Sequence, residues 1–219
     1  MQLIVCSIPN SIPDEQQLVQ ELLRCGLETF HLRKPEFSMD EMRKWLQQVS
    51  TADCSKMVLH SHWLLAEEFK MKGIHIGAGP LKNMPLTEQV AWINDAKRKQ
   101  WTISSSVHDQ EEINRLPKGF DYVWLSPIYE SISKQAYNRP YSQTQLDDWV
   151  KELKEHKQTQ VYALGGITAE HAAELTQRKF DGMVVLGSVW SMVKGIQDKE
   201  QVKQRIKQMI HSCKTDLIS

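Results

Sequence analysis

The sequence lacks the features that mark several large classes of protein. Its four cysteines, Cys6, Cys25, Cys54 and Cys213, form no Cys-x-x-Cys pair, so we expect reduced thiols rather than a disulfide framework or a structural zinc site. No run of about 18 apolar residues occurs, and no membrane span is expected. The apolar start has no basic flank and is too short for a signal peptide. These absences predict a cytoplasmic protein.

An excess of either charge is missing as well. Lysine and arginine together number 27, as do aspartate and glutamate, so a basic surface of the kind that binds nucleic acid is not indicated. A local basic pocket is still compatible with this balance. Hydrophobic residues make up 41% of the 219 residues, enough for a substantial core. The length suits one α/β barrel, and we expect a single domain over 1–219.

Short apolar runs alternate along the chain with longer amphipathic stretches. The runs predict strands at Leu3–Cys6, Thr29–Arg33, Met57–His60, Gly73–Ile76, Trp101–Ser104, Tyr122–Leu125, Gln160–Ala163 and Gly182–Val185. Helical patterns fall at about 13–25, 38–49, 62–71, 86–99, 109–115, 142–156, 168–178 and 188–212. Eight strand–helix units predict a single-domain (β/α)₈ TIM barrel. The alternative, an open doubly wound sheet, usually carries a glycine fingerprint after its first strand, and none follows Cys6 here.

Glycine-containing turns follow the last two predicted strands. The first is Gly165-Gly166-Ile167 and the second is Gly187-Ser188. In a barrel, the loops after the last two strands commonly hold a phosphate, and glycine lets backbone N–H groups approach an anion. One such turn alone is explained as well by tight chain reversal. Two turns at the expected positions predict a phosphate site.

Histidines and one arginine gather where strands are predicted to end. His31 and Arg33 share one side of their strand by its period of two, and His60, His75 and His108 end or follow other strands. The arginine fork suits phosphate or pyrophosphate, although an ion pair with a neighbouring strand would also explain it. The imidazoles are candidates for acid–base work near neutral pH. Packing roles stay open for each of them, and their spacing gives no local metal-ligand motif.

Two polar segments complete the candidate site. Ser106 follows the fifth predicted strand, where it would contact a substrate oxygen or cap the next helix. No Gly-x-Ser-x-Gly elbow surrounds it, so a triad hydrolase is not supported. The polar stretch 129–141 is long for a loop in a compact domain and is a candidate lid. Lys134 within it would reach over the barrel mouth.

The chain resembles the thiamine phosphate synthase family, including its thiazole tautomerase branch. The resemblance rests on short segments in a fixed order along residues 3–195. These segments are His31-Leu-Arg33, Gly73-Ile-His75-Ile-Gly77, Ser106-Val-His108, Asp121-Tyr122-Val, Ser126-Pro127-Ile-Tyr129, Lys134, Ala163-Leu-Gly165-Gly166-Ile and Asp181-Gly182-Met-Val-Val. Each segment is weak alone, and their order and spacing make the match specific.

The resemblance implies a barrel that joins hydroxymethylpyrimidine pyrophosphate to a thiazole phosphate, with Mg²⁺ on the pyrophosphate. By this likeness, Arg33 and Lys134 hold the leaving pyrophosphate, with Ser131 and Ser133 beside it, and Ser106 assists the pyrimidine. The two glycine turns seat the phosphate of the thiazole. The expected ligands are small phosphorylated molecules, thiamine phosphate among them, and the residues leave open whether the chain forms a homodimer.

The sequence departs from the synthase pattern where that family binds Mg²⁺. Ser61 and Pro80 stand where the synthases have metal-binding aspartates, and histidines replace oxygen ligands poorly for a hard cation. The tautomerase branch resembles this chain more closely in its His-x-Arg strand and its missing acids. Its catalytic histidine aligns with Pro127, so His31 or His60 would take that role near the thiazole carboxylate. The alternatives are a catalytically silent barrel that binds thiamine phosphate and an unrelated phosphate-binding barrel enzyme.

Overall fold

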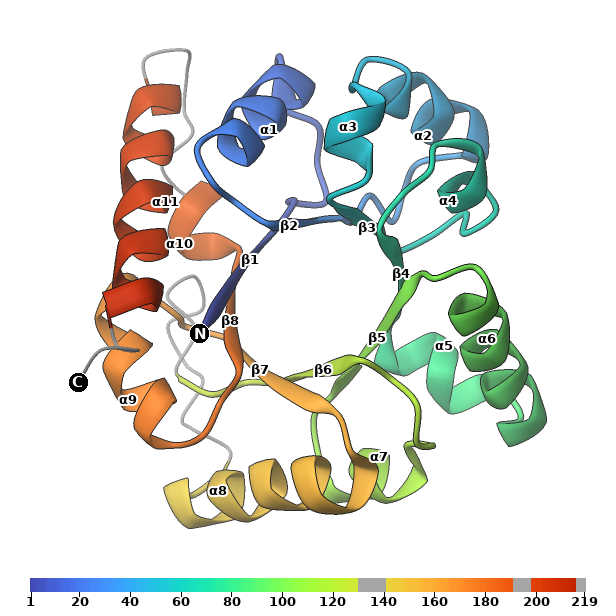
Figure 1. The fold of residues 1–219 in the computed structure, drawn as a ribbon, viewed down its shortest axis with the longest axis vertical. Helices are drawn as coiled ribbons and strands as arrows, with labels where there is room; N and C mark the ends of the chain where they lie inside the picture. The colour runs from blue at the N-terminus through green and yellow to red at the C-terminus, as the bar shows by residue number, and fades with distance from the viewer. Residues whose placement is uncertain (130–140, 191–197, 216–219) are drawn as a thin grey trace.

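A computed structural model describes residues 1–129, 141–190 and 198–215. Its eight strands form one closed parallel barrel in the order of the sequence (Figure 1). The strands are β1 (Gln2–Cys6), β2 (Thr29–Leu32), β3 (Met57–Leu59), β4 (Gly73–Ile76), β5 (Thr102–Val107), β6 (Tyr122–Leu125), β7 (Gln160–Leu164) and β8 (Gly182–Val185). Pairing of Gln2 with Gly182 joins β8 to β1. This closure confirms the TIM barrel, because an open sheet would leave both strands with a free edge.

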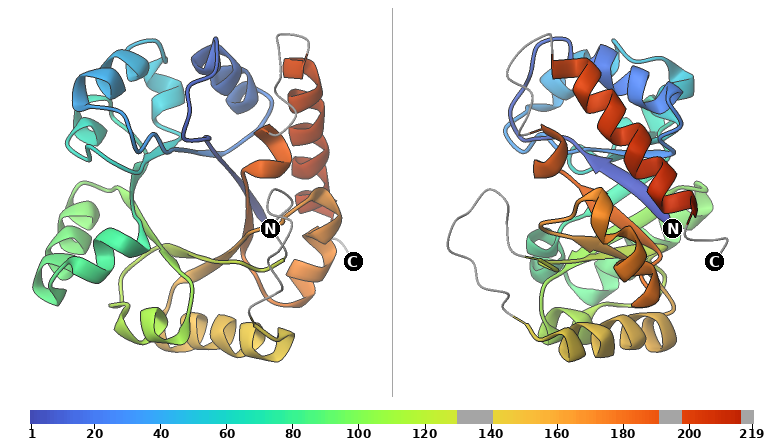
Figure 2. Two further views of the ribbon diagram at one scale, coloured as in Figure 1. Left: turned by 180° about the vertical axis from the view of Figure 1, so that it is seen from behind. Right: turned by 90° about the vertical axis from the view of Figure 1, so that its left-hand side faces the viewer.

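Helices surround the barrel on its outside (Figures 1 and 2). The α-helices are α1 (Glu15–Arg24), α2 (Met39–Leu46), α3 (Thr51–Cys54), α4 (Leu65–Glu68), α5 (Ala78–Asn83), α6 (Leu86–Arg98), α7 (Gln110–Arg115), α8 (Gln143–Glu152), α9 (Ala172–Gln177), α10 (Gly187–Trp190) and α11 (Asp198–Thr215). A π-helical turn (Leu153–Lys157) extends α8, and a 3₁₀ turn (Ala169–His171) precedes α9. None of the described helices is long and apolar enough to cross a membrane.

Side-chain caps begin several of these helices. The carboxylate of Asp109 accepts a hydrogen bond from the N–H of Glu112 and starts α7 as predicted. Ser38 and Ser142 each form a capping box at the start of α2 and α8. Such caps satisfy N–H groups that the first helical turn leaves unpaired. The sequence predicted a single helix over 188–212. In the structure, the described residues of this range belong to two helices, α10 and α11.

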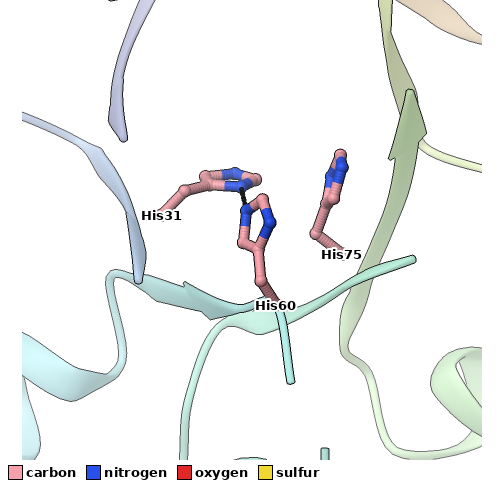
Figure 3. Close-up of side chains that lie close together, drawn as sticks. All are labelled: His31, His60 and His75. Atoms are coloured by element: carbon pink, nitrogen blue, oxygen red, sulfur yellow. Dashed lines mark hydrogen bonds between the residues drawn. The ribbon is translucent and has the colours of Figure 1, made fainter. Parts of the chain in front are cut away.

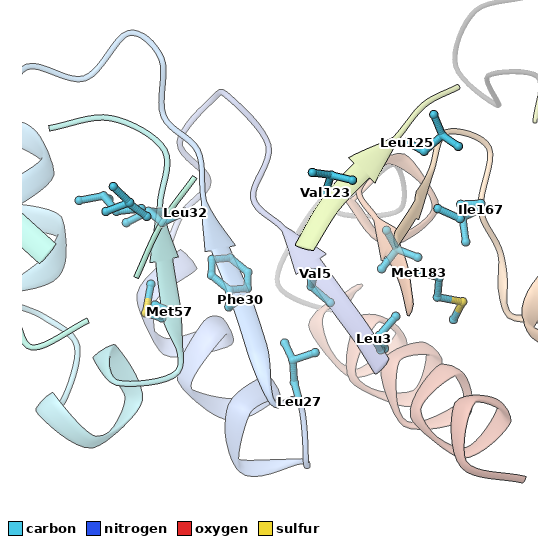
Figure 4. Packing of buried hydrophobic residues seen from close by; sticks show 14 of the residues in the cluster. Leu3, Val5, Leu27, Phe30, Leu32, Met57, Val123, Leu125, Ile167 and Met183 are labelled. Carbon is cyan, nitrogen blue, oxygen red and sulfur yellow. The ribbon is translucent and has the colours of Figure 1, made fainter. Parts of the chain in front are cut away.

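The largest apolar cluster lies between the barrel and its helices (Figure 4). Parallel strands covered by helices bury both faces, which explains the continuous apolar runs read from the sequence. Inside the barrel a smaller cluster collects Ile4, Cys6, Val184 and the aromatic residues of β6 and β7. The remaining interior is polar, with His31, His75 and Ser104 almost completely buried. This polar part of the interior leads directly to the site.

Candidate active site at the carboxyl ends of the strands

A cavity of about 620 Å³ opens where the strands end. Arg33, His60 and Ser106 line it, as the sequence predicted. Ser106 lies within β5 rather than after it, because that strand extends to Val107. His75 and His108, two of the acid–base candidates, line it as well, and so do Ser61 and Pro80. The wall residues that were not candidates include Cys6, Lys34, Gly77, Trp124, Leu164 and Leu186.

Three histidines from neighbouring strand ends meet at the floor of the cavity (Figure 3). His31 Nδ1 lies 2.9 Å from His60 Nε2 in a hydrogen bond. The ring of His60 stacks on that of His75 with 4.2 Å between the centroids. His75 in turn bonds the hydroxyl of Ser106 through Nε2 at 2.9 Å. The strand-end positions of these residues predicted their proximity.

Trp124 packs against all three imidazoles. Its ring lies 4.6 Å from His31 and 4.3 Å from His75, measured between centroids. Its buried Nε1–H has no hydrogen-bond partner among the described residues. The buried hydroxyl of Ser61 also has no partner among them. Buried polar groups normally find a partner. Two unpaired groups at one cavity are therefore available to hydrogen-bond a polar ligand or water.

Burial keeps the three imidazoles neutral. Burial, together with the smaller effect of the Arg33 charge, lowers the pKa of His75 to about 3. The pKa values of His31 and His60 also fall well below 6.5, first through burial and then through the neighbouring His75. A neutral imidazole has one donor and one acceptor nitrogen. The cluster can therefore pass protons without holding a charge.

The three histidines do not fit a metal ion in this arrangement. Their ligand nitrogens lie within 4.8 Å of one another, and imidazole suits zinc and related metals. However, the rings of His60 and His75 are inclined by only 22°, so their in-plane lone pairs do not converge on one ion. Both nitrogens of His75 are hydrogen-bonded to serine hydroxyls. Mg²⁺ prefers oxygen ligands, and no aspartate or glutamate is among the described residues of the cavity wall.

Arg33 supplies the available positive charge of the cavity. Its side chain is exposed and forms no ion pair within the described part of the chain. The adjacent Lys34 is engaged elsewhere, because its ammonium lies 2.7 Å from the carboxylate of Glu15 and both side chains are buried. The Arg33 charge adds to the effect of burial that lowers the pKa values of His60 and His75, and it opposes the burial that raises the pKa of the Cys6 thiol. Its charge therefore acts on the floor of the site.

The two glycine turns follow Leu164 and Leu186, which line the cavity. Gly165 and Gly166 have φ angles of 101° and 64°, a region that side chains rarely adopt. The carbonyl of Gly165 accepts from the N–H of Tyr129, which holds the turn in place. At the second turn, the buried Ser188 hydroxyl has no partner among the residues described. The turns thus stand at the rim, and their phosphate-binding role stays a prediction.

Three predicted residues, Ser131, Ser133 and Lys134, lie outside the described residues. His31 takes a buried position beneath the cavity rather than on its wall. It contacts the wall through a hydrogen bond to His60 and through packing against Trp124. The sequence placed it correctly at a strand end, but the depth of its side chain depends on the barrel's closure.

The buried histidines predict a loss of stability in acid. In the unfolded chain His75 takes up a proton near pH 6.5, whereas in the folded protein it does so near pH 3. The unfolded state therefore binds more protons in this range, and the free energy of unfolding falls as the pH falls from 6.5 to 3. His75 alone contributes on the order of 5 kcal/mol to this loss.

Denaturant titrations across this pH range measure the effect. His75→Gln should flatten the pH dependence, while His156→Gln, at an exposed position, should leave it unchanged. An unaltered pH dependence in His75→Gln would show that this imidazole is not held neutral by burial.

The profile of a family described as thiamine monophosphate synthase matches residues 1–189. The chain belongs to this family, whose members are enzymes of thiamine biosynthesis and act on small phosphorylated substrates. This membership confirms the resemblance seen in the sequence.

Individual relatives agree with this assignment. The thiamine-phosphate synthase of Lactococcus lactis is 24% identical over 206 residues, covering 91% of this chain and 89% of that protein. The thiamine-phosphate synthase of Rhizobium etli is 26% identical over 182 residues, covering 81% and 84%. The structure of a thiamine phosphate pyrophosphorylase from Bacteroides thetaiotaomicron superposes with a TM-score of 0.77 at 29% identity over all of both chains.

Proposed function

We propose that this chain binds a thiazole phosphate at the carboxyl ends of its strands and moves a proton on the bound ring. This is the reaction type of the thiazole tautomerase branch. The observation that carries the proposal is the cavity wall: neutral imidazoles from His60 and His75 face a space in which no carboxylate of a described residue lies.

Imidazoles suit this chemistry because one neutral ring both accepts and donates a proton. Tautomerisation removes a proton from one atom of the ligand and adds a proton to another, and no group leaves. An anionic ligand would also raise the pKa values of His60 and His75 from their depressed range, since a nearby negative charge favours the protonated form. Binding itself would thus make the imidazoles better bases.

The anchoring groups match a ligand with two anionic parts. Arg33, on the cavity wall, offers a guanidinium that forms no ion pair with a described residue. The turn at Gly165 and Gly166 follows β7, and the Ser188 hydroxyl, which has no partner among the described residues, follows β8. We assign the phosphate to the glycine turns and the carboxylate of the thiazole to Arg33. Such charge-assisted contacts are the strong ones in a ligand site.

Coupling of the pyrimidine and the thiazole is the second candidate, because the named relatives are thiamine-phosphate synthases. Departure of pyrophosphate builds negative charge that cations and a metal must stabilise. Arg33 would supply part of this charge. Ser61 and Pro80, where the synthases have aspartates, offer no carboxylate to a metal. No other described residue of the cavity wall supplies a carboxylate in their place.

Two assays on the purified chain separate the candidates. We expect conversion of the thiazole carboxylate phosphate between its tautomers, followed by NMR, to proceed equally with Mg²⁺ and with EDTA. Coupling with hydroxymethylpyrimidine pyrophosphate should give no product above background under either condition. Mg²⁺-dependent coupling would replace this proposal by the family's default reaction. Binding without either turnover would make the chain a silent thiazole phosphate binder.

A further inference from the structure

Three side chains form a short series of hydrogen bonds that begins at the cavity wall and ends inside the barrel. The hydroxyl oxygen of Ser106, on the wall, lies 2.9 Å from His75 Nε2. His75 Nδ1 lies 2.9 Å from the hydroxyl oxygen of Ser104. Ser104 is completely buried on β5, and its hydroxyl donates to the carbonyl of Ile74 on β4 at 3.4 Å. The series therefore ends on a backbone carbonyl.

The next residue of β5 makes the same kind of bond to β4. Ser105 is also completely buried, and its hydroxyl donates to the carbonyl of Ile76 at 2.6 Å. Successive side chains of a strand point to opposite faces of the sheet, so Ser105 points away from the face that holds Ser104 and His75. No hydrogen bond joins Ser105 to an imidazole of the described residues. Of these two neighbouring serines, Ser104 is the one that also bonds a histidine.

The carbonyl of Ile74 gives the series its direction, because a carbonyl only accepts. A serine hydroxyl has one hydrogen, and that of Ser104 is directed at this carbonyl. The Ser104 oxygen therefore accepts the hydrogen of His75 Nδ1. Burial lowers the pKa of His75 to about 3, and the neutral ring has a single N–H. Its Nε2 is thus a lone pair, which accepts the hydrogen of Ser106.

The opposite arrangement would make His75 a donor toward the cavity. If Ser104 turned its hydrogen toward His75 Nδ1, its bond to the Ile74 carbonyl would be lost. His75 would then carry its hydrogen on Nε2 and donate it to Ser106. In that tautomer no lone pair of the ring faces Ser106, and His75 could not take up a proton there. The acceptor that Ser104 uses therefore decides whether His75 can act as a base.

We propose that Ser104 is a positioning residue that holds His75 in the Nδ1–H tautomer, so that His75 is the base that acts on the bound ligand through Ser106. The inference rests on the proposed function and names the residues that move its proton. A proton passes from the ligand to Ser106 Oγ while the hydrogen of Ser106 passes to His75 Nε2. The reverse transfer gives a proton to a second atom of the ligand, so the protein gains and loses none. The anionic ligand stabilises the positive charge that His75 holds in between.

The tautomer of His75 tests the proposal without any turnover. Two-bond ¹H–¹⁵N correlation spectra of the wild-type protein should show His75 with its hydrogen on Nδ1. In Ser104→Ala the acceptor of this hydrogen is lost, and the Nε2–H form should appear. Ser104→Thr keeps a hydroxyl and should keep the Nδ1–H form. Hydrogen on Nε2 in the wild-type protein, or an unchanged tautomer in Ser104→Ala, overturns the proposal.

Ser105→Ala is the matched control for the effect on turnover. Each alanine variant removes a buried hydroxyl that bonds a carbonyl of β4, so both should lose a similar amount of stability. Ser104→Ala alone should also lower kcat in the tautomerisation assay, by roughly 10- to 100-fold with KM unchanged, since an acid–base group contributes about 10²-fold or more. Ser104→Thr should recover most of this loss.

The outcomes separate this inference from the proposed function. Equal kcat values in Ser104→Ala and Ser105→Ala would overturn the role of Ser104 in the reaction. If the wild-type protein shows the Nδ1–H tautomer of His75 but no turnover, the positioning by Ser104 stands and the proposed function fails.

Discussion

Replacing Lys34 with methionine is expected to lower the free energy of unfolding by about 3–5 kcal/mol, because it leaves a buried carboxylate without its counter-ion. The ammonium of Lys34 bonds Glu15 at 2.7 Å and the carbonyls of Ile8 and Asn10 at 2.9 and 2.8 Å. The side chains of Lys34 and Glu15 are 0% and 1% exposed. The Lys34 ammonium therefore connects the end of β2 with the loop before α1 through hydrogen bonds. Chemical denaturation measures the loss.

Lys99→Met is the matched control for this prediction. Lys99 also forms a lysine–carboxylate pair, with Glu67, but the Glu67 side chain is 69% exposed, and surface pairs contribute little. The double variant Lys34→Met with Glu15→Leu should recover most of the lost stability, since replacing a whole buried pair by apolar groups is often close to neutral. Equal losses in Lys34→Met and Lys99→Met would contradict the argument.

Replacing Arg33 with alanine should weaken binding of the thiazole phosphate roughly 10- to 100-fold, the effect of losing one charge-assisted contact of about 1.5–3 kcal/mol. Arg33 is the cation of the cavity wall that no described carboxylate neutralises. Its loss also removes a positive charge that lowers the pKa values of His60 and His75. Calorimetric titration with the thiazole phosphate measures the affinity.

Two further variants serve as controls for Arg33→Ala. Arg33→Lys keeps the charge but loses the planar fork, and its affinity should fall between those of the wild type and the alanine variant. Arg98→Ala removes an exposed arginine on α6 and should bind as the wild type does. Unchanged affinity in Arg33→Ala would show that the ligand's second anionic group binds elsewhere.

The sequence by itself determined the barrel and the edge at which the site lies. Alternation of apolar runs with amphipathic stretches is a local property, so all eight strands were placed to within a few residues. Parallel strands bring their carboxyl ends to one rim. For that reason Arg33, His60 and Ser106 were predicted together, and they line one cavity. The two glycine turns were found in the same way, because their position after β7 and β8 depends only on the order of elements.

Only the tertiary structure decided what lies beneath that rim. The pairing of Lys34 with Glu15, the contact of Trp124 with three imidazoles and the hydrogen bond between Tyr122 and His31 each join residues far apart in the sequence. Such contacts depend on which side chains the closed barrel turns inward and how deep each one sits, and a linear pattern carries neither quantity. A tryptophan or tyrosine in an apolar strand has the same local signature whether it only fills the core or contacts a reactive group. The two glycine turns were therefore visible in the sequence, while the buried polar contacts required the fold.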